Sequence, residues 1–197
     1  FMQTIAICNT VFSSIDDNGE MHFHSSSPDE EALINFVMKH NVQLLHHDHE
    51  IIRFSIFDDE EEFQILNVLE FCSSRRRMSV IVKSTDGTIF VFSKGADDAM
   101  LSILNESEDV AVYRERVKEL AMKGLRTLCM GYKTMSLEEY DLLRKQLHSA
   151  TCATENRAQE VDSIYAKIES NLTYLGCSGI EDALQEDVPE TIQALRD

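Results

Sequence analysis

The chain has 197 residues, and its 18 Lys or Arg against 35 Asp or Glu give a formal net charge of −17. Hydrophobic residues make up 43% and charged residues 27%, which is typical of a globular domain and not of a disordered or fibrous chain. The acidic excess repels phosphate backbones and argues against a general nucleic-acid binder, so any anionic ligand needs a local group of cations. No run approaches the ~20 apolar residues of a membrane-spanning helix.

The first strong helix signal in chain order is Ser27-Pro28-Asp29-Glu30. Ser27 can cap the helix, Pro28 suits its first turn, and Glu30 can complete a capping box. Apolar residues at helical spacing then predict a helix that runs to about His40.

The sequence from Val42 to Lys94 is rich in Ile, Val and Phe. Four runs in it are expected to form strands: Ile51–Phe57, Phe63–Phe71, Met78–Lys83 and Thr88–Lys94. Asp86-Gly87 is a hairpin turn signal between the last two runs, so an antiparallel sheet is predicted. The acidic residues 58–62 are expected to form an exposed connection between strands, not a cation site.

Helical and strand patterns alternate in the second half. Helices are expected over 96–104, 110–123, 136–148 and 157–170, strands over 125–132 and 172–177, and a last helix from near Val188. After Gly179 the chain turns polar. Because this strand, loop and helix have nothing in the chain to pack on, we expect them to belong to the edge of a neighbouring domain. The predicted class is therefore α+β, an antiparallel sheet flanked by helices, with domains at 1–174 and 175–197.

Potential metal ligands do not form a convincing site. The five cysteines are odd in number, widely spaced and without a CxxC pair, which argues against a disulfide framework or zinc ribbon and fits a reducing compartment. His46-His47-Asp48-His49 has suitable residue types. Adjacent residues of an extended segment point to opposite faces, however, so a solvated loop is the better interpretation.

Three segments have the residue types that hold an anionic, ring-bearing ligand. The segment from Phe71 to Met78 places an aromatic ring and three arginines between two strands, so that a purine could stack while Arg76 meets an anion. Lys94-Gly95-Ala96-Asp97 and the Gly124–Leu128 segment, with Arg126, each place a cation beside a glycine. Taken singly, each segment also suits a structural role as core, cap or solvated surface.

Together these segments resemble the nucleotide-binding (N) domain of a class 4 P-type ATPase, the phospholipid-transporting or flippase branch. The resemblance is carried by five motifs in the family's order: Ser27–Leu33, Phe71–Met78, Lys94–Asp97, Gly124–Leu128 and Ile180–Ile192. Residues 5–11 also resemble the opening helix of that domain. The resemblance implies the N-domain fold over 1–174 and the start of the phosphorylation (P) domain over 175–197.

The resemblance also implies a set of ATP-binding residues. Phe71 is expected to stack on adenine with Met78 packed nearby, and Lys94 to line the adenine pocket. The remaining expected contacts are Glu30 on the purine side, Arg126 at the phosphate chain, Arg76 near the nucleotide, and Ser73 where some cation pumps carry Arg. No catalytic residue and no metal ligand is expected in this chain, because the DKTGT, TGD and GDGxND segments of the family are not in its sequence.

The implied function is to present ATP to the acceptor aspartate of the P domain in a cytosolic part of an integral membrane pump. Its implied partners are ATP, with Mg²⁺ in the full-length pump, the P and actuator domains, and phospholipid through a membrane domain. We expect the chain to be an inactive, monomeric fragment that binds no nucleic acid. Two other hypotheses are an acidic α+β protein-interaction module without nucleotide binding, and a complete haloacid-dehalogenase-type phosphatase, against which the lack of a DxDxT segment argues.

Overall fold

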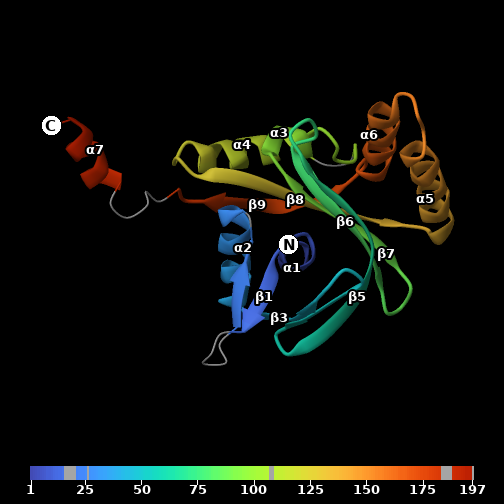
Figure 1. The fold of residues 1–197 in the computed structure, drawn as a ribbon, viewed down its shortest axis with the longest axis horizontal. Coiled ribbons are helices and arrows are strands. Elements are labelled where there is room, and N and C mark those ends of the chain that lie inside the picture. Colours follow the sequence, from blue (N-terminus) through green and yellow to red (C-terminus); the bar gives the residue numbers. More distant parts are fainter. Residues whose placement is uncertain (16–20, 26, 107–108, 183–187, 197) are drawn as a thin grey trace.

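The computed structural model describes residues 1–15, 21–25, 27–106, 109–182 and 188–196 (Figure 1). The helices of this part are α1 Met2–Ile7, α2 Pro28–Met38, α3 Asp97–Leu101, α4 Val110–Ala121, α5 Leu137–Thr151, α6 Arg157–Ile168 and α7 Val188–Arg196. Its strands are β1 Phe12–Ile15, β2 Met21–His24, β3 Val42–His47, β4 Ile51–Ile56, β5 Asp59–Cys72, β6 Arg77–Ser84, β7 Ile89–Gly95, β8 Arg126–Met135 and β9 Thr173–Ile180.

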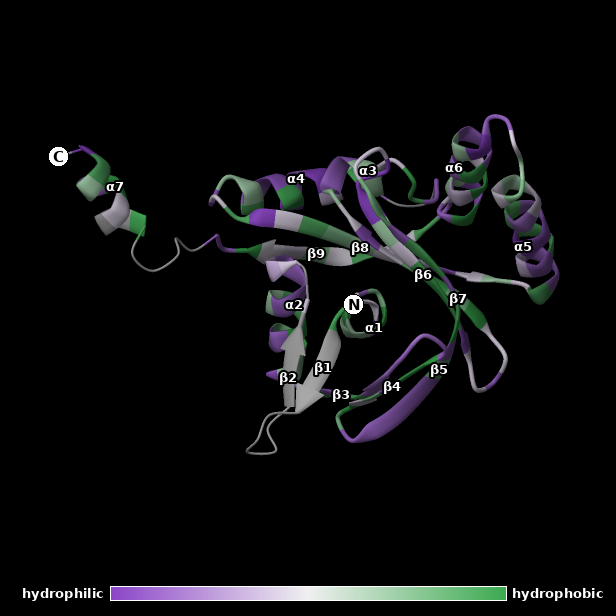
Figure 2. Ribbon diagram, viewed as in Figure 1, coloured by the Kyte–Doolittle hydropathy of each residue, from purple (hydrophilic) through white to green (hydrophobic). Residues whose placement is uncertain are grey.

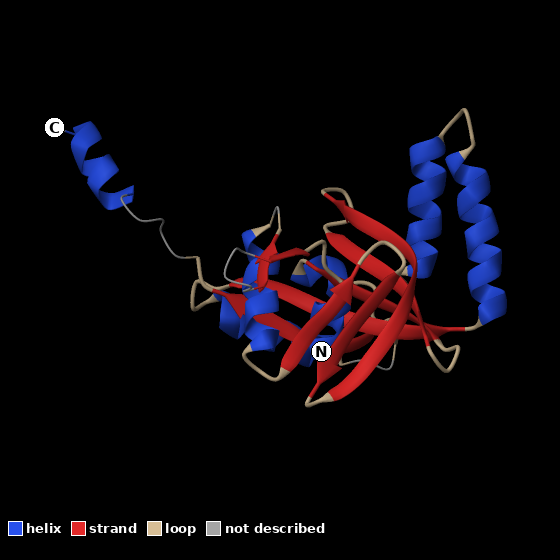
Figure 3. Cartoon of the chain, turned by 60° about the horizontal axis from the view of Figure 1, so that its bottom comes forward, coloured by secondary structure: helices blue, strands red, loops and turns tan. Residues whose placement is uncertain are grey.

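Strands β3 to β9 form one seven-stranded antiparallel sheet whose spatial order is the sequence order, and β1 pairs with β2 as a separate hairpin. The sheet curls strongly, and the α5–α6 hairpin projects from one end of it (Figure 3). The predicted α+β class with an antiparallel sheet flanked by helices is thus confirmed. The predicted turn at Asp86-Gly87 joins β6 to β7, and Gly87 has φ +91°, a conformation that glycine adopts without strain.

The core lies on both faces of the sheet. Val80 and Val82 of β6 pack with α1 and α2, which lie inside the curl. Ile81, between them in sequence, packs on the opposite face with α5 and α6, and α3 and α4 cover Cys129 of β8 on a third cluster. Because successive side chains of a strand point to opposite faces, one apolar run supplies two core layers.

Two local predictions are wrong. The acidic residues 59–62 are not a loop, because they begin β5, whose hydrophilic end is purple in Figure 2. The connection is only the two-residue turn Phe57-Asp58, both with positive φ, as a tight hairpin turn requires. The helix expected over 96–104 is shorter, since α3 ends at Leu101.

The C-terminal segment divides into a packed strand and a separate helix. Strand β9 pairs with β8 from Thr173 to Ile180, so it is an edge strand of the main sheet and crosses the expected boundary between 174 and 175. The expectation that this strand packs on nothing in the chain is therefore wrong, whereas the boundary itself stays a prediction. Helix α7 lies apart from the sheet in Figure 1. Residues 183–187 of the expected Ile180–Ile192 motif lie outside the described residues.

Candidate functional site

One hollow of about 580 Å³ opens where α2 meets the middle of the sheet. Its lining comes from the segment after α1, the start of α2 and strands β5 to β8, and consists of Thr10, Ser27, Asp29, Glu30, Glu70, Phe71, Met78, Lys94, Gly95 and Leu128. We refer to it as the β-sheet pocket. Four of the seven residues predicted to bind a nucleotide line it, namely Glu30, Phe71, Met78 and Lys94.

A buried ion pair forms the inner end of the pocket. The Lys94 Nζ donates to Glu30 Oε1 over 2.6 Å, and Glu30 Oε2 accepts from the Thr10 hydroxyl at 2.6 Å and from the Ser25 hydroxyl at 2.9 Å. Burial raises the pKa of the Glu30 carboxyl, but the Lys94 ammonium and the hydrogen bonds outweigh burial and lower that pKa below 4.5. Glu30 is therefore an anion that holds Lys94 in place.

The helix start differs from its prediction for the same reason. Ser27 makes no side-chain capping hydrogen bond in α2, and the Glu30 carboxylate binds Lys94 instead of reaching back to the cap. The predicted capping box is therefore wrong at α2. At α5, by contrast, the Ser136 side chain does cap the helix, because its hydroxyl accepts from the Glu139 amide.

Phe71 provides an accessible ring at the mouth of the pocket. It lies at the end of β5 and is 63% exposed, so its ring is open to a ligand. Met78, at the start of β6, is paired in register with Lys94 of β7. The ring, the thioether and the ammonium group therefore come from three adjacent strands, β5, β6 and β7, around one hollow.

The turn between β5 and β6 separates three consecutive arginines into two environments. Arg75 and Arg77 are buried, and both bind the Glu169 carboxylate at the end of α6. Arg76 has φ +50° and faces outward, where its Nη2 donates to Asp98 over 2.6 Å. Arg76 and the exposed Ser73 do not line the pocket, so their expected roles near a nucleotide stay predictions.

Arg126 lies at the rim and is fully engaged by carboxylates. Its Nη1 is 2.9 Å from both Asp29 oxygens, and its Nη2 is 2.6 and 2.7 Å from the two Asp182 oxygens. Asp29 lines the pocket, whereas Arg126 itself does not. With Lys94 and Glu30 included, three carboxylates face two cations, so the site without ligand has a net negative charge. An anionic ligand must therefore replace carboxylates at Arg126.

Sequence reasoning missed several lining residues. Asp29 and Leu128 belong to segments that were recognised, yet neither was selected as a site residue. Thr10 and Glu70 have no local sequence signal, because their positions depend on how α1 and β5 meet α2. Glu169 was also missed, since a glutamate near the end of a helix resembles any surface residue until the fold places it beside Arg75 and Arg77.

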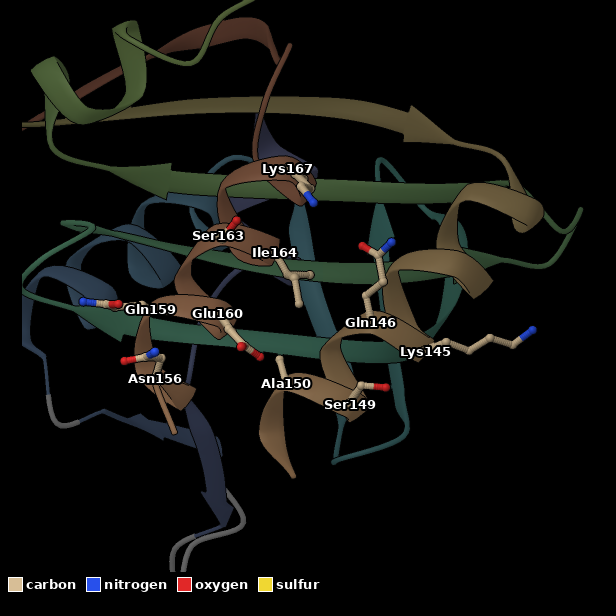
Figure 4. A pocket seen from close by; sticks show the side chains of 10 residues that line it. All are labelled: Lys145, Gln146, Ser149, Ala150, Asn156, Gln159, Glu160, Ser163, Ile164 and Lys167. Atoms are coloured by element: carbon tan, nitrogen blue, oxygen red, sulfur yellow. The ribbon is translucent and has the colours of Figure 1, made fainter. Parts of the chain in front are cut away.

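A second hollow of about 620 Å³ lies between α5 and α6, away from these residues (Figure 4). Polar side chains of both helices point into it, among them Gln146 and Glu160, as Figure 4 shows. None of the ten described residues that line it carries an aromatic ring, and none was predicted to bind a ligand. The β-sheet pocket is therefore the better candidate site.

Comparison with known proteins places the chain in a family. Residues 1–187 match the family described as "P-type ATPase, cytoplasmic domain N", so the chain belongs to the N domains of P-type ATPases. It is 39% identical to the phospholipid-transporting ATPase DNF1 of Chaetomium thermophilum and 38% identical to the phospholipid-transporting ATPase IH of Homo sapiens, in both cases over 100% of the chain. The family predicted from the motifs is confirmed.

The similarity covers only part of those relatives. The chain spans 13% of the Chaetomium protein and 18% of the human one. It also spans 15% of the phospholipid-transporting ATPase IK of Mus musculus, to which it is 36% identical. In the described residues, no helix is long and apolar enough to cross a membrane.

Proposed function

We propose that the β-sheet pocket binds ATP. The observation that carries the proposal is the exposed ring of Phe71 over a hollow that ends at the buried pair of Lys94 and Glu30. Adenine stacks on this ring with Met78 beside it, because a base presents a flat π-face that an aromatic side chain covers well. The charged pair lies within reach of the polar purine edge, and the phosphate chain extends toward Arg126 at the rim.

In the longer protein, the domain presents the γ-phosphoryl group to an acceptor aspartate of the P domain, and the resulting phosphoryl transfer drives phospholipid translocation. The residues of this chain bind and orient the nucleotide, since phosphoryl transfer depends mainly on positioning and charge stabilisation. The chain supplies no catalytic residue. It acts as a monomeric cytosolic domain of a membrane pump, beside the P and actuator domains.

Mg²⁺ that accompanies ATP neutralises charge on the phosphates. Among the described residues, no group of three or more His, Cys, Asp or Glu side chains is arranged to hold a metal ion, and both Asp29 and Asp182 are engaged by Arg126. We therefore propose that the ion is held by the phosphates and by residues outside this chain.

The test is an ATP titration of the chain followed by NMR, with Phe71→Ala as the main variant. Wild type should show amide shifts at Phe71, Lys94 and Arg126. The variant should lose about 1–3 kcal/mol of binding free energy, the contribution of one base stacked on a ring. Phe57→Ala is the matched control, because Phe57 is also exposed but lies in the β4–β5 turn. Absence of shifts at all three residues would refute the proposal and favour an interaction module without nucleotide binding.

A further inference from the structure

Glu169 is a fully buried carboxylate with three side-chain hydrogen-bond partners. It is 0% exposed at the C-terminal cap of α6. Its Oε1 accepts from the Arg75 guanidinium and, at 2.7 Å, from the Ser79 hydroxyl, and its Oε2 accepts from Arg77 Nε at 2.6 Å. The Ser79 hydroxyl is in turn 2.8 Å from that of Ser93. Such a saturated buried carboxylate fixes the positions of the groups that donate to it.

This cluster lies directly behind the β-sheet pocket. Ser79 pairs in register with Ser93, one position along from the pair of Met78 and Lys94 that lines the pocket. Because neighbouring residues of a strand point to opposite faces, the serines and Glu169 lie on the far side of the same two strands. The hydrogen bonds of Glu169 and the serines therefore fix β6 and β7 on one face of the sheet. The opposite face of the same two strands lines the proposed adenine site.

The cluster also fixes the turn that carries Phe71. Arg75 and Arg77 flank Arg76, and this turn links the end of β5 to Met78 at the start of β6. Besides Glu169, the Arg75 guanidinium donates to the Glu70 carbonyl at 2.6 Å and lies 4.8 Å from the centre of the Tyr165 ring. Glu70 immediately precedes Phe71, and both line the pocket. The position of the ring therefore depends on Arg75 and, through it, on Glu169.

Contact with Gly95 leaves the turn little freedom on its other side. The Ala96 amide donates to the Arg76 carbonyl at 3.0 Å. A Cβ on Gly95 would lie 2.6 Å from the same carbonyl oxygen and closer still to Arg77 Cβ. The turn thus packs closely against the backbone of Lys94 and Gly95 on one side, and Glu169 binds its arginines on the other.

We propose that Glu169 is a positioning residue of the ATP site, which sets the place of Phe71 and Met78 through Arg75 and Arg77 without touching the nucleotide. This inference rests on the proposed function. Helix α6 supplies no residue to the pocket. By this inference it nevertheless controls the affinity of the pocket for the adenine base.

Glu169→Gln tests the inference in the 197-residue chain, because the amide keeps the shape of the carboxylate but replaces one of its two acceptor oxygens by a donor and removes the negative charge. Affinities for ATP and CTP are measured by competition with a fluorescent nucleotide at a temperature where each variant is folded by circular dichroism. The ratio of the two affinities isolates the base, since the phosphates are identical. We expect ATP binding to weaken about tenfold, the share that stacking of one base supplies. CTP binding should change less than about twofold, because the single ring of cytosine covers less of the Phe71 ring than the two rings of adenine do.

Ile164→Ala is the control for stability. Ile164 is buried on the same helix, so its truncation loosens α6 without removing a charge, and its ATP to CTP ratio should equal that of wild type. A Glu169→Gln chain with the wild-type ratio, or an Ile164→Ala chain with the same loss of ratio, would overturn the inference. A wild-type chain that binds no ATP would refute the proposed function as well.

Should Glu169→Gln fail to fold, Arg75→Met replaces it. That variant keeps a one-to-one pair of Glu169 with Arg77 but frees Glu70 and Phe71 from the guanidinium. The ATP to CTP ratio should fall at least about threefold, a fraction of the stacking contribution. An unchanged ratio in folded Arg75→Met would overturn the inference.

Discussion

The buried arginines behind the pocket and the exposed arginines outside it both pair with carboxylates, but with different consequences. Arg75 and Arg77 bind Glu169 with almost no solvent contact, whereas the Arg76 and Arg126 side chains bind Asp98, Asp29 and Asp182 while 52% and 48% exposed. A buried pair cannot exchange its partner without leaving a desolvated charge. An exposed pair contributes only about 0–1 kcal/mol, so a polyphosphate can replace its carboxylates. All four arginines pair with carboxylates, so the pairing does not distinguish them. Their solvent exposure does, because only an exposed arginine can exchange its carboxylate for a ligand.

The largest effect should follow from breaking the buried set. Glu169→Gln leaves two guanidinium groups behind the sheet, and we expect the free energy of unfolding to fall by about 3–5 kcal/mol. Glu62→Gln is the matched control, because Glu62 binds Arg53 over 2.7 Å at an exposed site, and its effect should stay below about 1 kcal/mol. Urea unfolding followed by circular dichroism measures both. Equal losses would contradict the distinction between buried and exposed pairs.

A steric change to the same turn should have the next largest effect. Gly95→Ala forces a methyl group into the Arg76 carbonyl and the Arg77 backbone, and backbone atoms cannot rotate away. We expect a loss of about 3 kcal/mol in the free energy of unfolding, at the upper end for overpacking.

Gly124→Ala separates crowding from backbone strain in that experiment. A methyl group there would meet nothing within 4 Å, but Gly124 has φ +78°, so we expect a loss of only about 1 kcal/mol. Thermal unfolding of both variants gives the comparison. If Gly124→Ala is the more damaging change, contact with the arginine turn does not constrain Gly95.

The sheet was largely predictable from the sequence, whereas its edges and the arginines were not. Apolar runs and the Asp86-Gly87 turn identify β4 to β7 because those strands have strong local patterns. Strand β9 was expected to end near Cys177 but continues to Ile180, because its two glycines and Ser178 give no β signal and only pairing with β8 orders them.

Part of the candidate site was predictable for a similar reason. Phe71 and Lys94 stand in recognisable motifs, so their shared pocket was expected. In the sequence, the three consecutive arginines of the Phe71–Met78 segment cannot be told apart. Which of them is buried depends on Glu169, which lies 92 residues beyond Arg77 in the chain, and local sequence cannot contain that relation. The same applies to Asp182, whose contact with Arg126 requires the completed sheet.

Removing one carboxylate from Arg126 at the rim should raise the affinity of the pocket for ATP. In Asp182→Asn, Arg126 keeps its contacts to Asp29 but loses an anionic competitor of the phosphates, so ATP should bind about threefold more tightly, in line with an exposed pair. Glu62→Gln is the control, because it removes a carboxylate from an exposed pair with Arg53 outside the pocket, and it should leave the affinity unchanged. Calorimetric titration at two salt concentrations checks this, since the gain should shrink at higher salt. Weaker binding by Asp182→Asn would mean that the carboxylate supports the ligand and does not compete with it.

The smallest effect is a pH dependence that distinguishes Glu30 of the pocket from His47 at the end of β3. The pKa of Glu30 lies below its ordinary 4.5 in the folded chain. The unfolded chain therefore takes up the proton first as pH falls, and the stability contributed by the charged carboxylate is complete above pH 4.5 and is lost as pH falls through the folded-state pKa. At His47 it is burial that lowers the pKa below 6.5, because burial disfavours the charged imidazolium. The stability contributed by the neutral His47 therefore begins to be lost near pH 6.5 as the pH falls. Melting temperatures from pH 8 to 3 should decline in two stages. His47→Gln should remove the upper stage and Glu30→Gln should flatten the lower one. A lower stage that persists unchanged in Glu30→Gln would show that the pair with Lys94 does not govern acid stability.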